Sequence, residues 1–329
     1  MGPWDPNTLA LCFGGGILGA AMGGLWAFEL CALLVFVGCI TVLGGGSDYL
    51  LLQVGLGPAF GPHVGGFASG VAAACYAVGV RKNHPTGAAK DILSPLIDTS
   101  WDVLAVGGVF AVGGHLLLSV LNKIPIINQF DTIALNVVIT GLVARLLFLK
   151  EMPWGASESI QKHGYFGTND TAISWVPWQA RAGRYLSLGL GVGLLSGGLA
   201  MGLKQQLDPM AAKNLISPAG AFVVPLIMGW CIASLNLICL QCGTGSVQKV
   251  PVYHCMAILS ALAFLYSGSI AVAGGVGLLA ALLQEFCARM VYNHGSSHID
   301  PPATAICLGT LFLNLAFKPE FLNLGNLFR

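Results

Sequence analysis

The chain has 329 residues, of which 55% are hydrophobic and only 9% are charged, and its formal net charge is +1. About 25% of the residues of an ordinary soluble domain are charged, so this composition excludes a water-soluble globular protein. A net charge this small gives no indication of a nucleic-acid partner. At roughly 20 residues per span, the length allows about ten transmembrane helices. We therefore predict an all-α polytopic protein of a plasma membrane, the inner membrane of a prokaryote, with the lipid bilayer around it.

The N-terminal half, residues 1–150, is predicted to hold about five of these spans. Residues 8–46 are almost uninterrupted apolar sequence, broken only by Glu29. Their length fits two spans that turn near residues 24–29, where the carboxylate of Glu29 would be solvated. Three further spans are expected in this half, at about residues 63–80, 101–121 and 132–149.

Residues 151–184 form the one long polar stretch, and their tryptophans suit an interfacial linker between two halves. The C-terminal half, residues 185–329, is predicted to hold about five more spans. Glycine is common throughout, with 45 residues, and in lipid glycine lets helix backbones approach closely. The expected C-terminal spans lie at residues 185–203 and 219–240, in a pair between 252 and 289, and after residue 302.

Two stretches share one order of features: an apolar helix, an acidic residue, a connector that holds a histidine, and a helix of small residues. In the first stretch the acid is Asp48 and the histidine His63; in the second they are Glu285 and His298. An odd number of spans separates the two stretches, so copies would be inverted in the membrane, as in many transporters. We predict an inverted internal repeat with two broken, re-entrant connectors, whose backbone needs protein or water around it.

Polar side chains inside a membrane are costly, so each is a candidate for function. Two imidazoles could line a polar path, donate hydrogen bonds to an anion or carry protons near neutral pH. The alternative is that each histidine only caps a helix or faces water. Helix N-termini after Pro62 and Pro302 would favour negative charge. Arg145 lies near the end of its span, where a long side chain can reach the interface. The predicted substrate-pathway residues are His63, His298, Asp300, Asp48, Glu285, Ser69, Thr304 and His115.

Metal binding and catalysis are weaker alternatives. His294, His298 and Asp300 have atom types that bind divalent metals, but no second cluster with firm spacing accompanies them. Ser69 lies before Gly70, but Phe67 replaces the first glycine of the Gly-x-Ser-Gly sequence of rhomboid-type proteases. We therefore expect no metal, no cofactor and no enzymatic activity.

The sequence His298-Ile-Asp-Pro301-Pro302-Ala303 resembles the His-Pro-Pro-Ala motif of the HPP family of integral membrane proteins, with Ile299 and Asp300 inserted into it. A second stretch, Gly114-His115-Leu-Leu, is also similar to that family. The family is implicated in nitrite transport, so the resemblance implies an anion transporter. The rest of the chain resembles uncharacterised prokaryotic multi-pass proteins, which implies no activity.

Two functions fit this sequence. The first is a transporter or channel for a small solute, such as an anion, with Asp48 and Glu285 able to couple proton or cation movement. The second is a non-transporting structural or assembly subunit of a larger membrane complex or array. For either function we expect a homo-oligomer or partner membrane subunits.

Overall fold

The computed structural model describes residues 2–167, 170 and 172–318, and every regular element among them is helical, which confirms the all-α prediction. The predicted C-terminal half extends to residue 329, and its last eleven residues lie outside the described part. The helices are α1 (Pro6–Met22), α2 (Gly24–Leu43), α3 (Ala68–Tyr76), α4 (Trp101–Leu121), α5 (Thr132–Ala144), α6 (Ser157–His163), α7 (Ala182–Ala212), α8 (Pro218–Leu235), α9 (Ile238–Cys242), α10 (His254–Ser267), α11 (Ile270–Cys287) and α12 (Pro301–Phe317).

Short helical turns of other types adjoin these helices. A π-helical turn, Leu50–Gly55, precedes α3, and three more directly follow α3, α5 and α11. The three are Ala77–Arg81, Arg145–Leu149 and Ala288–Tyr292, and 3₁₀ turns lie at Ile127–Gln129 and Gly245–Gln248.

Six helical segments of the described chain are long and apolar enough to cross a membrane, which makes this a membrane protein. About 20 apolar residues are needed to span a bilayer. Three further apolar helices, α1, α10 and α12, are shorter than this. The span expected at residues 63–80 holds the nine-residue α3 and most of the π-helical turn Ala77–Arg81 that continues it. The predicted count of ten is therefore not confirmed. The six segments are Gly24–Leu43, Trp101–Leu121, Thr132–Leu149, Ala182–Ala212, Pro218–Cys242 and Ile270–Tyr292.

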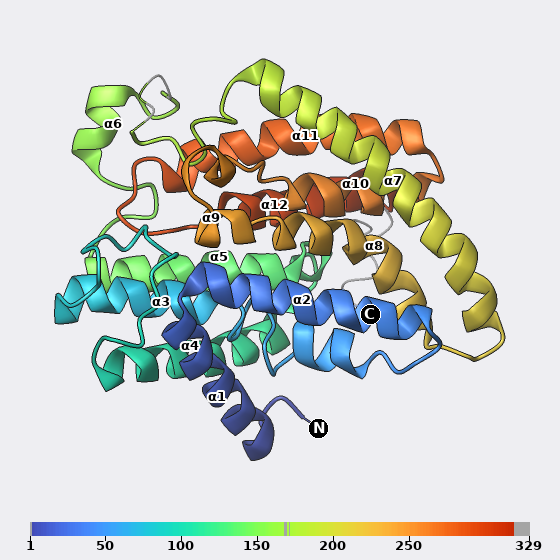
Figure 1. The fold of residues 1–329 in the computed structure, drawn as a ribbon, viewed down its shortest axis with the longest axis horizontal. Helices are drawn as coiled ribbons and strands as arrows, with labels where there is room; N and C mark the ends of the chain where they lie inside the picture. The colour runs from blue at the N-terminus through green and yellow to red at the C-terminus, as the bar shows by residue number, and fades with distance from the viewer. Residues whose placement is uncertain (1, 168–169, 171, 319–329) are drawn as a thin grey trace.

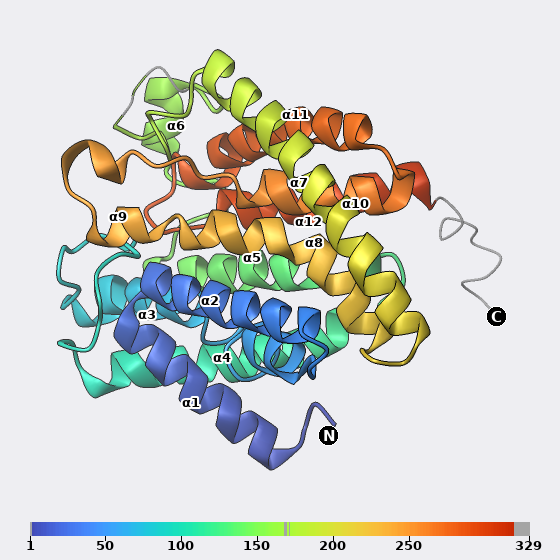
Figure 2. The ribbon, with the colours of Figure 1, turned by 45° about the vertical axis from the view of Figure 1, so that its right-hand side comes forward.

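The helices that come first in the chain and those that come last lie on two sides of the molecule (Figure 1). Helices α1 to α5 form one side, and α7, α10, α11 and α12 form the other. Two pairs join the sides, because α2 packs against α8 and α5 packs against α12. The second view shows the same arrangement, with α8 beside α2 (Figure 2).

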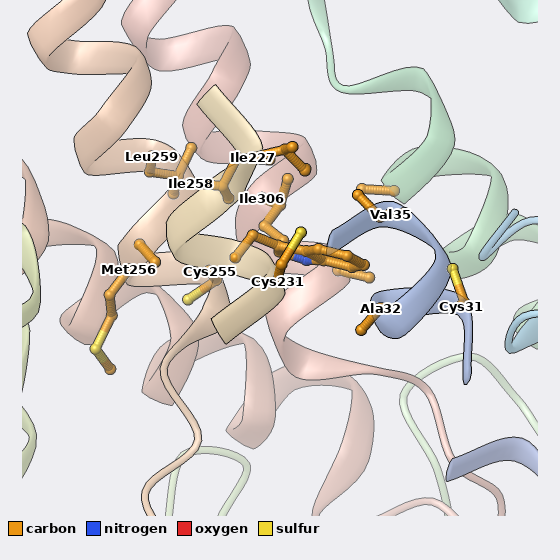
Figure 3. Packing of buried hydrophobic residues seen from close by; sticks show 14 of the residues in the cluster. Cys31, Ala32, Val35, Ile227, Cys231, Cys255, Met256, Ile258, Leu259 and Ile306 are labelled. Atoms are coloured by element: carbon orange, nitrogen blue, oxygen red, sulfur yellow. The ribbon is translucent and has the colours of Figure 1, made fainter. Parts of the chain in front are cut away.

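The hydrophobic core continues through this junction. Cys31 and Val35 of α2 are buried in the same cluster as Cys231 of α8, Cys255 of α10 and Ile306 of α12. Figure 3 shows these side chains converging from four helices. The two halves are therefore packed as one body rather than joined only by the polar linker.

The turn between the first two helices is sharper than predicted. Gly23 adopts a positive φ of 86°, a conformation that favours glycine, and α2 begins at the next residue. Glu29 consequently lies in the second turn of α2 rather than in a solvated loop. Its side chain is 3% exposed, and neither carboxylate oxygen has a hydrogen-bond partner among the described residues.

The first predicted connector is part of a broken helix that runs along α2. Leu51 lies against Gly38, Gly55 against Val35, and Gly70 against Gly24, so the chain passes α2 from its end to its start. The break falls within residues 56–67, between the π-helical turn and α3.

The second connector, residues 293–300, has a different geometry. It follows α11 and its π-helical extension directly and reverses the chain into α12. Near the end of α12, Asn314 accepts a hydrogen bond from Tyr266, which lies at the end of α10, just before α11 begins. Because only the first connector is preceded by a returning half-helix, the two units differ in detail. The inverted repeat and the re-entrant geometry therefore stay predictions.

Candidate functional site

A cavity of about 500 Å³ lies between the two sides of the molecule. Its wall combines α2, α5 and the first connector with α8, α10, α12 and the polar linker. Ile227, Ile258 and Ile306 are among its apolar lining residues and come from three different helices (Figure 3). Small-molecule sites usually have volumes of about 300–1,000 Å³ and mostly apolar walls, so the cavity has the properties of a binding site.

Aromatic side chains form a connected chain along this wall. The ring of Phe28 lies 5.7 Å from that of Phe67 and 5.3 Å from that of Trp230. The ring of His298 lies 5.7 Å from Phe67 and 5.1 Å from Tyr292. Edge-to-face contacts at these distances stabilise a fixed arrangement of rings. Phe67 belongs to the first connector and His298 to the second, so the two connectors meet at the cavity.

The carboxylate of Asp300 lies next to His298 in the wall. Oδ1 of Asp300 is 3.4 Å from Nε2 of His298, and both residues line the cavity. Oδ2 of Asp300 accepts a hydrogen bond from the backbone N–H of Ala303 at 2.7 Å, which caps α12. The hydroxyl of Thr304 donates to the Asp300 carbonyl. A protein carboxylate therefore already occupies the N-terminus of α12, where the sequence suggested that a bound anion would be favoured.

Lys90 brings a positive charge to one part of the wall. Its Nζ donates to the carbonyl of Asn293 at 3.0 Å and lies 4.4 Å from the centre of the Tyr292 ring. Burial, followed by the nearby Arg145 guanidinium, lowers the pKa of Lys90 to about 8. Lys90 was not among the predicted pathway residues, so its place in the cavity was missed.

Arg145 fixes the second connector from the side of α5. Its side chain is fully buried, and Nε donates to Oγ of Ser297 at 2.8 Å while Nη2 donates to the carbonyls of Ser297 and Val291. Nη1 donates to the carbonyl of Pro153, and Glu151 lies 3.6 Å away. The expectation that this arginine reaches the membrane interface is therefore wrong. The guanidinium instead satisfies backbone carbonyls that the reversal at 293–300 leaves without helical partners.

His294 lies in the same connector but faces a different environment. Its Nδ1 is 2.9 Å from the hydroxyl of Ser159, and its Nε2 is 3.0 Å from the carbonyl of Tyr165. Both ring nitrogens thus have protein partners, whereas His298 contacts the cavity. No group of three potential metal ligands occurs in the described ranges.

His63 and His115 lie together, away from the cavity wall. His63 is 1% exposed, and neither of its ring nitrogens has a partner among the described residues. Its carbonyl packs directly on Gly114 of α4, and His115 is close enough for the two imidazoles to interact electrostatically. Asn136 donates to the carbonyl of Gly114 at 2.7 Å. Of the two histidines of the predicted pathway, only His298 is among the residues that line the cavity.

The remaining predicted pathway residues are likewise not among the residues that line the cavity. Asp48 accepts a hydrogen bond from Ser217 at the start of α8. Glu285 pairs with Arg289 one helical turn later, at 3.0 Å. Ser69 donates to the carbonyl of Gly65 within the broken helix. Of the predicted set, only His298 and Asp300 line the cavity, and the pathway role of the others stays a prediction.

Several cavity residues carried no sequence signal that separates them from ordinary core residues. Phe28, Phe67, Trp230 and His254 lie in apolar segments, and only the fold brings them to one wall. The tryptophans of the polar linker were expected at an interface, and two of them, Trp175 and Trp178, line the cavity as well.

One family of proteins matches the chain over nearly its full length. The model of the family described as "Family of unknown function (DUF7973)" matches residues 1–206 and 220–323. No curated protein and no solved structure matches. The matching family is not the HPP family, so the resemblance at residues 298–303 stays unconfirmed.

Proposed function

Because the chain belongs to the DUF7973 family, whose function is unknown, we propose a function from the site itself: a membrane transporter or channel for a small solute. The observation that carries the proposal is the cavity of about 500 Å³ between the two halves, which both connectors line. Transporters commonly hold their solute between two halves, at helices that are interrupted within the membrane. The break at residues 56–67 and the connector at residues 293–300 are such interruptions.

In this proposal the chain crosses the membrane ten times, and its two halves are related by inversion. The shorter helices α1, α10 and α12 and the broken segment around α3 supply the four crossings beyond the six long helices. Gly16 of α1 packs against Gly107 and Ala111 of α4, so α1 lies alongside a helix long enough to span. A short helix that is surrounded by longer ones can cross where the bilayer thins locally.

The alternative, a structural subunit without a pathway, makes no use of this cavity. A scaffold is stabilised by tight packing, and a cavity with polar groups such as His298 and Asp300 in its wall is costly within a packed interior. The cavity therefore favours solute handling over a purely structural role. Oligomerisation and partner subunits stay expectations for either function.

The test is solute flux in proteoliposomes that contain the full chain. Small anions, cations and neutral organic solutes are screened for the wild type, for Ile306→Trp and for Leu195→Trp. Ile306 lines the cavity, whereas Leu195 of α7 is 71% exposed on the outside of the bundle. The proposal predicts flux that Ile306→Trp abolishes and Leu195→Trp leaves unchanged.

Two results would overturn the proposal. The first is equal flux in both tryptophan variants, because transport would then bypass the cavity. The second is the absence of flux for every solute in the panel while the protein stays monodisperse, which would favour the structural subunit.

A further inference from the structure

The charges in the cavity wall are not balanced. Asp131 and Asp300 both line the cavity, and Lys90 is the one lysine or arginine among the described lining residues. Neither carboxylate lies within ion-pair distance of a lysine or arginine in the described parts of the chain. With neutral histidines, the wall therefore carries two negative charges and one positive charge, a net charge of −1.

The ammonium group of Lys90 already interacts with other groups of the protein. The carbonyl of Asn293 accepts one of its hydrogen bonds, and the face of the Tyr292 ring lies on another side of the ammonium group. A protein carbonyl and a ring face both attract a cation. Lys90 is therefore poorly placed to balance a bound anion, and its presence does not make the cavity an anion site.

The aromatic rings of the wall also discriminate between charges. The face of an aromatic ring carries partial negative charge, which attracts cations and repels anions. Phe28, Phe67, Trp230 and Tyr292 line the same cavity as Asp300, and their rings contact the imidazoles of His254 and His298. Such walls suit a solute with an apolar body and a positive charge.

Because no lysine or arginine pairs with the two carboxylates and the wall is aromatic, we propose that the cavity binds a small organic cation, an amine or ammonium compound with an apolar body. Asp300 balances the charge of this cation, and the rings of Phe28, Phe67 and Trp230 contact its body. The inference rests on the proposed function, because it names the class of solute that the same cavity holds. It also replaces the anion suggested by the helix N-terminus, since the Asp300 carboxylate caps that terminus.

The proposal is tested by calorimetric binding to the full chain in lipid nanodiscs. The probes are benzyltrimethylammonium, benzenesulfonate and benzyl alcohol, which share one ring and differ in charge. The measurements are made at pH 8, where an ordinary histidine is neutral. The wild type is expected to bind the cation more tightly than the anion or the alcohol.

Asp300→Asn is the decisive variant, because asparagine keeps the cap of α12 and removes only the charge. Its affinity for the cation is expected to fall about tenfold or more, while its affinity for benzyl alcohol stays unchanged. Asp208→Asn is the matched control, because Asp208 pairs with Lys204 on an exposed surface. Trp230→Leu, which removes a ring face, is expected to weaken cation binding without creating a preference for the anion.

Three results would overturn the inference: tighter binding of benzenesulfonate than of the cation, no cation binding in the millimolar range, or an unchanged cation affinity in Asp300→Asn. These results are distinguishable from failure of the proposed function. Cation binding without flux would uphold the inference and overturn transport. Anion flux that Ile306→Trp blocks would uphold transport and overturn the inference.

Discussion

Arg145 donates a hydrogen bond from Nε to the hydroxyl of Ser297, 152 positions later in the chain, at 2.8 Å. The same guanidinium donates to the Ser297 carbonyl at 2.9 Å. Ser297 directly precedes the cavity residue His298, so a side chain of the π-helical turn after α5 sets the position of the opposite half's connector. Five donors in a planar fork suit this task, because one residue can satisfy several carbonyls at once.

Replacing Arg145 with leucine is expected to destabilise the protein by about 3 kcal/mol or more. The change leaves the carbonyls of Pro153, Val291 and Ser297 buried without a donor and removes the positive charge next to Glu151. Arg145→Lys should recover only part of this loss, because an ammonium group cannot reproduce the fork. The measurement is unfolding in one detergent, followed by tryptophan fluorescence.

Lys204→Met provides the matched comparison for Arg145. Lys204 is an exposed cation paired with Asp208, and such pairs contribute about 1 kcal/mol or less. Equal losses of stability in Arg145→Leu and Lys204→Met would contradict the anchoring role of Arg145. Ser297→Ala, which keeps the carbonyl bonds, should cost only about 1 kcal/mol.

Two glycines of α4 should respond oppositely to alanine. A Cβ at Gly107 would lie 2.5 Å from Cβ of Ala20 and 2.8 Å from the carbonyl oxygen of Gly16, so the α1–α4 contact must open. A Cβ at Gly113 meets no atom within 4 Å. We expect Gly107→Ala to destabilise the protein by about 1–3 kcal/mol. Gly113→Ala should be neutral or stabilise by up to about 1 kcal/mol.

The unfolding temperatures of both alanine variants in the same detergent check this prediction. If Gly113→Ala lowered the unfolding temperature as much as Gly107→Ala, the contact between α4 and α1 could not explain the loss of stability.

Asp300 is expected to act on stability through its cap and on binding through its charge. Asp300→Ala removes the acceptor for the Ala303 N–H and should cost about 0.5–2 kcal/mol of stability. Asp300→Asn keeps an acceptor and should leave the unfolding transition nearly unchanged. Thermal unfolding of both variants without ligand checks this separation, and a large loss in Asp300→Asn would contradict it.

Lys90 should make stability increase with pH in the alkaline range. Its pKa is lowered to about 8 in the folded protein, while an unfolded lysine titrates near its ordinary value of 10.5. Between these values the unfolded chain binds more protons, so stability rises with pH by at most about 1.4 kcal/mol per pH unit. The destabilisation by the buried ammonium is fully present below pH 8.

Denaturant unfolding of wild type and Lys90→Met between pH 7 and 10 measures this effect. The variant should lack the rise, so the difference between the two proteins changes across this range. Parallel pH profiles would show that Lys90 titrates as an exposed lysine does. Lys213→Met, at an exposed position after α7, is the control.

The class of fold and the helix positions followed from local patterns. The low charge content predicted the helical membrane protein, and the apolar runs at 101–121 and 132–149 coincide with segments that the structure describes. Pro301 and Pro302 indicated the start of α12, because proline placement acts within one turn. The turn at Gly23 was placed a few residues late, because an isolated glycine in an apolar run has several possible roles.

The cavity could not be predicted, because its wall depends on contacts between distant residues. In the sequence, Phe28 and Trp230 have the pattern of core residues in two separate helices. Only the packing of α2 on α8 brings their rings together. Arg145 is the clearest example of a residue whose role depends on distant contacts. Its position near a span end favoured an interfacial role, whereas its partners include Ser297 of the second connector, about 150 positions away.

The cavity wall belongs to both halves, so the volume available to a solute depends on how the halves are placed against each other. A solute that fits the cavity binds one arrangement of the two halves more tightly than the others. Binding therefore shifts the population of molecules toward that arrangement, by an amount set by the difference in affinity between the arrangements. Occupancy and the separation of the halves are thereby thermodynamically linked. Spectroscopic probes on α2 and α8 would then report the solute as a change in the distribution of distances, even when the solute itself carries no label.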